Sequence, residues 1–286
     1  MSLSPAPPLS PAVSSSDTPA STRIAAIQTV SGSDVEQNLQ TVARLVAEAA
    51  AAGARLVALP EYFSLITADE QAKVRMREAD GRGPQQDFLA ELAQRHKVWL
   101  VGGTIALTAD AEGKVRNTTL VFDAQGQRVA RYDKIHLFSF QRGEERYEEA
   151  ATIEPGSTVC TFDSPLGRIG LSVCYDLRFP ELYRAMGTVD LIIVPAAFTY
   201  TTGRAHWEVL LRARAIENQC YVMAPAQGGR HASDRVTWGH SMIIDPWGEV
   251  LACREQGEGV VLADLEPERI ARMRASLPAL SHRCLG

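Results

Sequence analysis

Apolar residues along the chain follow two periodicities, which predict alternating strands and helices. Short apolar runs at residues 23–28, 55–61, 98–103 and 168–174 indicate buried strands. Between the first two runs, apolar residues recur at helical spacing over residues 35–49. Ser33 and Asp34 are the expected start residues of this helix, with Ser33 and Glu36 placed as in a capping box, and Gly53 is expected to end it.

The rest of the chain continues the same mixture. Residues 118–123 and 128–134 predict a hairpin around Gly126. Further strands are expected at residues 190–198, 220–227, 240–246, 249–253 and 260–265, and further helices at 85–96, 179–187, 205–218 and 267–275. Since no repeat or interior linker interrupts them, residues 22–286 are predicted to form one α/β domain. Residues 1–21, rich in Ser, Pro and Ala, are expected to be a disordered tail.

Composition narrows the classes of function. Hydrophobic residues make up 45% and charged residues 22% of the chain, as in ordinary globular proteins. The formal charge of −5 and the lack of a basic run give no indication of a nucleic-acid partner. No apolar stretch reaches the roughly 20 residues of a membrane span, and the N-terminus lacks the features of a secretory signal.

The five cysteines are odd in number and scattered, without a C-x-x-C pair. They predict neither a zinc site nor a disulfide framework, and they favour a reducing, cytoplasmic location.

Cys174 has the most informative sequence context. It ends the apolar strand 168–174 and precedes a helix, which is the pattern of a nucleophile elbow. We expect the helix N-terminus to lower the pKa of the thiol and the amide of Tyr175 to stabilise an oxyanion. On this feature alone, a buried structural cysteine is about as good an explanation.

A thiol nucleophile needs a proton acceptor. The six histidines (His96, His136, His206, His231, His240 and His282) are all candidates on sequence alone. Glu61 and Lys134 are the other candidates, because each ends a predicted strand where loops gather at a sheet edge. Taken singly, each would ordinarily be a solvated surface charge.

Three segments together resemble the carbon–nitrogen hydrolase (nitrilase) superfamily. LPEYF contains Glu61, YDKIHLF contains Lys134 and SVCYDLRFPELYR contains Cys174, in the superfamily's order. The resemblance spans about residues 22–283 and implies that neither a metal nor an organic cofactor is needed. It implies a four-layer αββα sandwich whose subunits pair through the helix 205–218 and the helix after Cys174, giving a homodimer or a larger homo-oligomer.

The resemblance also implies roles. Cys174 would be the nucleophile, Glu61 the general base, and Lys134 the oxyanion donor together with the amide of Tyr175. A second glutamate, expected to orient Lys134 and the attacking water, matches Glu149, with Glu148 as the alternative.

Segments within residues 198–222, 227–248 and 277–283 look most like the deaminated glutathione amidase branch. That branch cleaves deaminated glutathione to 2-oxoglutarate and cysteinylglycine. The close alternative is an ω-amidase acting on 2-oxoglutaramate or 2-oxosuccinamate, and a nitrilase or N-carbamoyl amidase is more distant. A non-catalytic scaffold of the same fold is the alternative from another class.

Each of the favoured substrates is a small amide that carries a carboxylate. We expect Arg178 to bind that carboxylate, unless it pairs with Glu181, and the charged segment 138–152 to help select the substrate. Residues expected to line the pocket are Phe198, Thr199 and Thr202. Residues expected in the core, at an interface or in structural hydrogen bonds are His206, Trp207 and His240.

Overall fold

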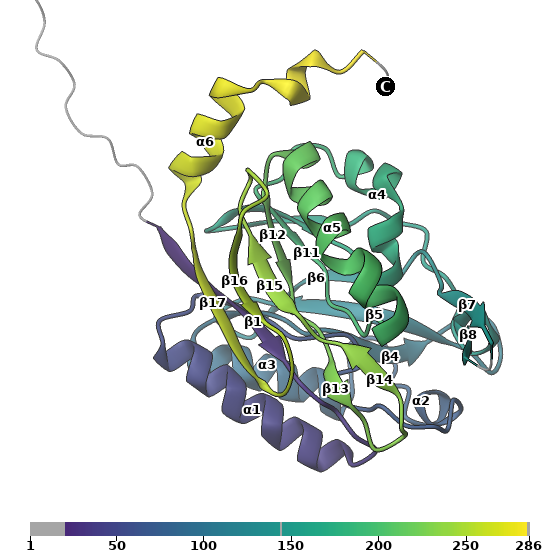
Figure 1. Cartoon of the computed structure of the whole chain (residues 1–286). Helices are drawn as coiled ribbons and strands as arrows, with labels where there is room; N and C mark the ends of the chain where they lie inside the picture. The colour runs from purple at the N-terminus through teal and green to yellow at the C-terminus, as the bar shows by residue number, and fades with distance from the viewer. Residues whose placement is uncertain (1–20, 144, 285–286) are drawn as a thin grey trace, which may run out of the picture.

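The computed structural model describes residues 21–143 and 145–284; the predicted tail, apart from residue 21, lies outside this range. Two β-sheets lie face to face between two layers of helices (Figure 1). The first sheet has the order β17-β1-β2-β3-β5-β4, with β6 paired to β5. Its strands are β1 (Thr22–Gln28), β2 (Leu56–Ala58), β3 (Trp99–Val101), β4 (Ile105–Thr108), β5 (Val115–Phe122), β6 (Arg128–Asp133) and β17 (Gly259–Leu265).

The second sheet has the order β16-β15-β12-β11-β10-β9. Its strands are β9 (Thr161–Ser164), β10 (Gly167–Leu171), β11 (Leu191–Ile193), β12 (Tyr221–Ala224), β15 (Ser241–Ile244) and β16 (Val250–Arg254). Two separate hairpins extend from the sandwich: β7 (Ser139–Arg142) with β8 (Glu145–Glu148), and β13 (Gly228–Arg230) with β14 (Val236–Trp238).

Alternation along β1 shows how the layers assemble. Ile24 and Ala26 pack in the core that contains the second sheet, whereas Ala25 and Ile27 face α1 (Val35–Ala51) and α3 (Pro84–His96). On the far side, α4 (Pro180–Ala185) and α5 (Tyr200–Asn218) pack on the second sheet. The predicted four-layer αββα arrangement is therefore confirmed. Two further helices are α2 (Ala72–Arg75) and α6 (Pro267–Ser276).

Several predicted boundaries were wrong. The N-cap of α1 is Asp34, whose side chain accepts from Gln37 N, so Ser33 and Glu36 form no capping box. The strand expected over 55–61 ends at Ala58, and the strand expected over 168–174 ends at Leu171. Within the described ranges, no helix has the length and apolar character of a membrane span.

The helix expected from residue 205 begins at Tyr200. Thr199 caps it, with its side chain accepting from the N–H of Thr202. This earlier start places the N-terminus of α5 at the candidate site.

Candidate functional site

Loops that follow three strands bring the candidate residues together. Glu61 lies in the turn after β2, Lys134 directly follows β6, and Cys174 begins a short 3-10 helix after β10. Glu61 and Cys174 line the same cleft, and Lys134 Nζ lies 2.9 Å from Glu61 Oε1. Residues separated by up to 113 positions in the sequence (174 − 61) thus meet where the two sheets face each other.

Lys134 is enclosed by carboxylates. Its side chain is 0% exposed, and its ammonium donates to Glu61 Oε1 and to both oxygens of Glu149, at 2.9, 2.9 and 2.8 Å. Burial lowers the pKa of Lys134, but Glu149 and Glu61 more than offset this effect, so its pKa is raised. Lys134 therefore remains an ammonium ion at neutral pH.

Of the two glutamates considered for the second position, Glu149 contacts Lys134. It begins the 3-10 helix Glu149–Ala151, and its carboxylate accepts from Phe138 N at 2.7 Å and the Tyr62 hydroxyl at 3.0 Å. Burial acts to raise the pKa of Glu149, but Lys134 and these donors lower it overall. Glu148 is exposed and bonds to Ser139 instead.

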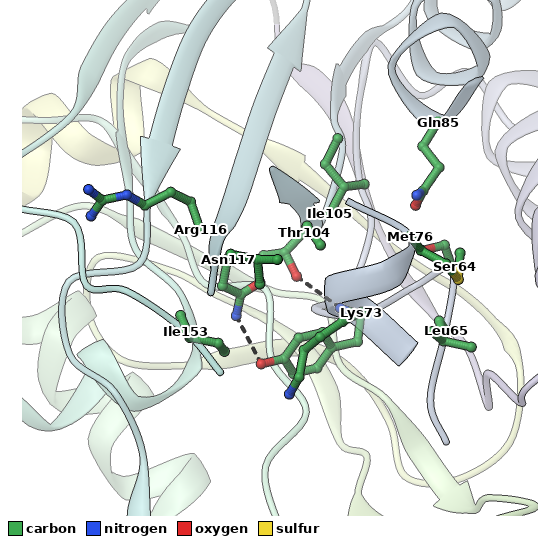
Figure 2. A pocket seen from close by; sticks show the side chains of 13 residues that line it. Ser64, Leu65, Lys73, Met76, Gln85, Thr104, Ile105, Arg116, Asn117 and Ile153 are labelled. Atoms are coloured by element: carbon green, nitrogen blue, oxygen red, sulfur yellow. Dashed lines mark hydrogen bonds between the residues drawn. The ribbon is translucent and has the colours of Figure 1, made fainter. Parts of the chain in front are cut away.

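Two hydrogen-bond donors that the sequence did not reveal, Asn117 and the N–H of Ala197, hold the Glu61 carboxylate in place. Asn117 Nδ2 donates to Glu61 Oε1 at 2.9 Å and to the Tyr62 hydroxyl at 3.1 Å, and Figure 2 shows Asn117 directed toward that hydroxyl. The backbone N–H of Ala197 donates to Glu61 Oε2 at 2.9 Å. A buried asparagine in a β-strand is the only signal of this network in the sequence, because a backbone amide leaves no sequence signal.

Cys174 adopts the strained backbone of a nucleophile elbow. Its φ is +50°, and its N–H donates to Pro195 O at 2.9 Å. The buried carboxylate of Asp176 fixes the turn, accepting from Val173 N at 2.8 Å and from the Tyr132 hydroxyl at 2.7 Å. The thiol is mostly buried, with the residue 8% exposed, but it lines the cleft.

The expected lowering of the thiol pKa was wrong. Burial and the neighbouring Glu61 raise the pKa of Cys174, and Lys134 offsets only part of the effect. The 3-10 helix that begins at Cys174 has only five residues, so its dipole has little effect on the thiol. The cysteine is therefore a neutral thiol at rest, which can attack only after a base removes its proton.

The cleft has a volume of about 280 Å³. Of the residues predicted to line it, Tyr175, Phe198, Thr199 and Thr202 do so. Within the described residues, no acceptor pairs with the N–H of Tyr175. The predicted charged segment 138–152 forms the β7–β8 hairpin and contributes Phe138 and Glu149 to the wall.

Arg178, which was predicted to bind a substrate carboxylate, is not among the residues that line the cleft. It ends the 3-10 helix, its guanidinium lies 3.2 Å from His206 Nδ1, and it stacks near the rings of Tyr175 and Phe198. Among the described residues, Arg178 also forms no ion pair with Glu181, which was the predicted alternative. The arginine that lines the cleft is Arg235, from the loop between β13 and β14, which sequence reasoning missed.

The histidines bond elsewhere. His136 Nδ1 lies 2.7 Å from Asp176, His231 bridges Ser31 O and the Thr237 hydroxyl, and His240 stacks on Trp238. None of the histidines in the described ranges lines the cleft with Cys174. Trp207 is fully buried, as predicted, and donates to His240 O, whereas His206 is exposed.

Comparison with known proteins agrees with this geometry. The family model described as carbon–nitrogen hydrolase matches residues 23–275. The chain belongs to the carbon–nitrogen hydrolase family. It is a hydrolase that acts on carbon–nitrogen bonds.

Individual relatives are similar over nearly their whole length. The hydrolase is 43% identical over 266 residues to the deaminated glutathione amidase of Synechocystis sp., covering 91% of this chain and 97% of that protein. It is 36% identical to human omega-amidase NIT2, covering 91% and 94%. Among solved structures, Saccharomyces cerevisiae Nit3, a member of the nitrilase superfamily, matches with a TM-score of 0.82 at 32% identity, covering 93% and 97%.

Proposed function

We propose that the hydrolase cleaves an amide through a thioester on Cys174. Glu61 takes the thiol proton, and the sulfur attacks the amide carbonyl carbon. Lys134 and the N–H of Tyr175 donate to the tetrahedral oxyanion. As the C–N bond breaks, Glu61 gives its proton to the departing amine or ammonia.

Water completes the cycle. Glu61 removes a proton from a water molecule oriented with the help of Glu149, and the resulting hydroxide attacks the thioester carbon. Collapse of the second tetrahedral intermediate breaks the C–S bond, releases the acid and returns a proton to the sulfur. No group outside the protein, the amide and water is required.

One observation carries this proposal: two carboxylates that line the cleft with the Cys174 thiol hold the buried ammonium of Lys134 between them. A neutral thiol needs a base, and Glu61 lines the cleft with Cys174. Lys134 is the cation positioned to offset negative charge on a substrate oxygen, and its ion pairs hold it rigidly.

We propose deaminated glutathione as the substrate and 2-oxoglutarate and cysteinylglycine as the products. The support is the name of the Synechocystis relative and its 43% identity over almost the whole chain. The alternative is 2-oxoglutaramate, supported by the similarity to human omega-amidase NIT2. The free thiols of all five cysteines fit a reducing, cytoplasmic setting for either reaction.

The substrate proposal is tested by comparing kcat/KM for the two amides under one set of conditions. Release of cysteinylglycine is followed for deaminated glutathione, and release of ammonia for 2-oxoglutaramate. We expect the former to be the better substrate. A preference of tenfold or more for 2-oxoglutaramate would instead favour the ω-amidase assignment.

We further propose that the hydrolase forms a homodimer through α5. Exposed apolar side chains on this helix and on the adjoining β15–β16 turn support this assignment: Val209 is 69%, Ile216 46% and Trp247 65% exposed. Light scattering after size-exclusion chromatography should give twice the monomer mass, and Val209→Asp should reduce it; a monomer in both cases would contradict the proposal.

A further inference from the structure

Arg235 reaches the reaction cleft from a part of the chain that holds none of the proposed catalytic groups. It lies on the loop between β13 and β14, and its Nη2 donates to Ala197 O at 3.0 Å. Ala197 in turn donates its N–H to Glu61, so a single residue, Ala197, connects the guanidinium to the proposed base by hydrogen bonds. Its carbon Cζ lies 5.3 Å from the ring centre of Tyr147 on β8.

The hydrogen-bonding capacity of this guanidinium is mostly unused. Of its five N–H bonds, one donates to Ala197 O, and the described residues offer it no other acceptor and no carboxylate within ion-pair distance. Its Nε is buried without a partner. Arg235 is only partly buried, but a buried polar atom such as its Nε normally has a hydrogen-bond partner, so an acceptor that arrives with the substrate would complete the site.

The charges around the cleft point to the same class of acceptor. Glu61 and Glu149 carry two negative charges, and Lys134 carries one positive charge. Without Arg235, these three groups would repel an anionic substrate. With Arg235, the four charges balance, and the positive group lies on the cleft wall while Lys134 is buried behind it.

We propose that Arg235 binds the carboxylate on the acyl side of the substrate, the end that remains attached to Cys174 in the thioester. This inference rests on the proposed function. The acyl side is favoured because the contact with Ala197 holds Arg235 within the small cleft of Cys174. The N-terminus of α5, at Thr199 and Thr202, lines the same cleft and adds a favourable dipole for an anion.

Arg235 also lines a neighbouring hollow together with Tyr62 and Lys73. Lys73 also lines the adjoining cavity drawn in Figure 2. A carboxylate on the leaving group could lie on that side, so the test must separate the two ends of the substrate.

The experiment uses Arg235→Met, with Arg230→Met as the control. Arg230 is on the same hairpin, its side chain is 69% exposed, and it pairs with Asp234 outside the cleft. Deaminated glutathione is measured together with two matched amides: 2-oxoglutaramate, and 4-oxopentanamide, in which a methyl group replaces the carboxylate. We expect Arg235→Met to lower kcat/KM for 2-oxoglutaramate by roughly 10- to 100-fold, mainly through KM, and to change 4-oxopentanamide hydrolysis by no more than about twofold.

A second variant and a binding measurement identify the role of the Arg235 side chain. Arg235→Lys should recover part of the lost kcat/KM, because lysine keeps the positive charge but cannot form the bidentate hydrogen bonds of a guanidinium. Protection of Cys174 from iodoacetamide by the product 2-oxoglutarate should be clear in the wild type and lost in Arg235→Met. This binding measurement needs no turnover, and circular dichroism verifies that each variant is folded.

Three results would overturn the inference. Equal losses on both amides would make Arg235 a structural residue. A loss confined to deaminated glutathione would place its partner on the leaving group. Unchanged kinetics and unchanged protection would show that it contacts neither end. If the wild type hydrolyses none of these amides, the proposed function itself fails. If the wild type is active and Arg235→Met keeps that activity, only the inference about Arg235 fails.

Discussion

Lys134 Nζ lies 2.9 Å from Glu61 Oε1, and both side chains are sealed from solvent, at 0% and 1% exposure. A buried ion pair stabilises the protein only while both charges are present, because removing one leaves the other buried without a counter-charge. The same enclosure keeps the ammonium and the carboxylate fixed before the substrate arrives. Stability and reactivity therefore depend on the same residues.

Lys134→Met should affect both properties. We expect kcat to fall by about 100- to 1000-fold, because one oxyanion donor is lost. Stability should fall by about 3–5 kcal/mol, because Glu61 and Glu149 remain buried without their shared cation. Urea unfolding and steady-state kinetics measure the two effects. A stable variant with normal kcat would show that the ammonium is not needed.

Glu61→Gln tests the proposed base. The amide can still accept from Ala197 N, but it cannot take the thiol proton, so we expect kcat to fall by roughly 100- to 10,000-fold. Glu148→Gln is the matched control, since Glu148 is an exposed glutamate next to Glu149 and outside the cleft. Turnover by Glu61→Gln within about tenfold of the control would indicate another base.

His231 makes stability depend on pH. Burial lowers its pKa to about 4, against about 6.5 in the unfolded chain. Between these values the unfolded state binds more protons, so stability is present above about pH 6.5 and is lost as the pH falls toward 4. The loss should reach about 1.4 kcal/mol per pH unit.

Urea unfolding at pH 7, 6 and 5 measures this slope. His231→Gln, which cannot take up a proton, should have a shallower slope than the wild type. Identical slopes in the two proteins would assign the acid sensitivity to other groups.

Gly203 determines how closely the β13–β14 hairpin approaches α5. A Cβ added there would lie 2.3 Å from Trp238 Cβ, so Gly203→Ala should push the hairpin, and Arg235 with it, away from the cleft. We expect a loss of about 1–3 kcal/mol in stability and a raised KM for amides that carry a carboxylate. Gly32→Ala is the control, because its Cβ would meet nothing within 4 Å. Equal thermal midpoints for the two variants would rule out the proposed crowding.

The sequence predicted the layers because burial on two faces of a strand and one face of a helix leaves a periodic pattern. It also located Glu61, Lys134 and Cys174, because three motifs in order resemble a known family, and it placed the second glutamate at Glu149 or Glu148. The boundaries of β2 and β10 were less accurate, since the apolar runs continue into loops that are also buried.

Arg178 does not line the cleft, and there is a physical reason why the sequence suggested it. Arg178 follows Cys174 by four residues, and the direction of its side chain depends on whether that turn is a 3-10 helix or an α-helix. The 3-10 turn directs it toward His206. Arg235 is 61 positions beyond Cys174 in a polar hairpin loop (235 − 174), and tertiary contacts such as the pairing of Thr199 with Thr237 bring that hairpin to the cleft.

The central claim is that the sulfur of Cys174 makes and breaks the bond to the acyl group. Cys174→Ala tests it most directly, with hydrolysis of deaminated glutathione and 2-oxoglutaramate measured alongside circular dichroism. The account predicts a folded protein whose hydrolysis of both amides falls to the uncatalysed background. A folded Cys174→Ala variant that hydrolyses either amide at the wild-type rate would contradict it.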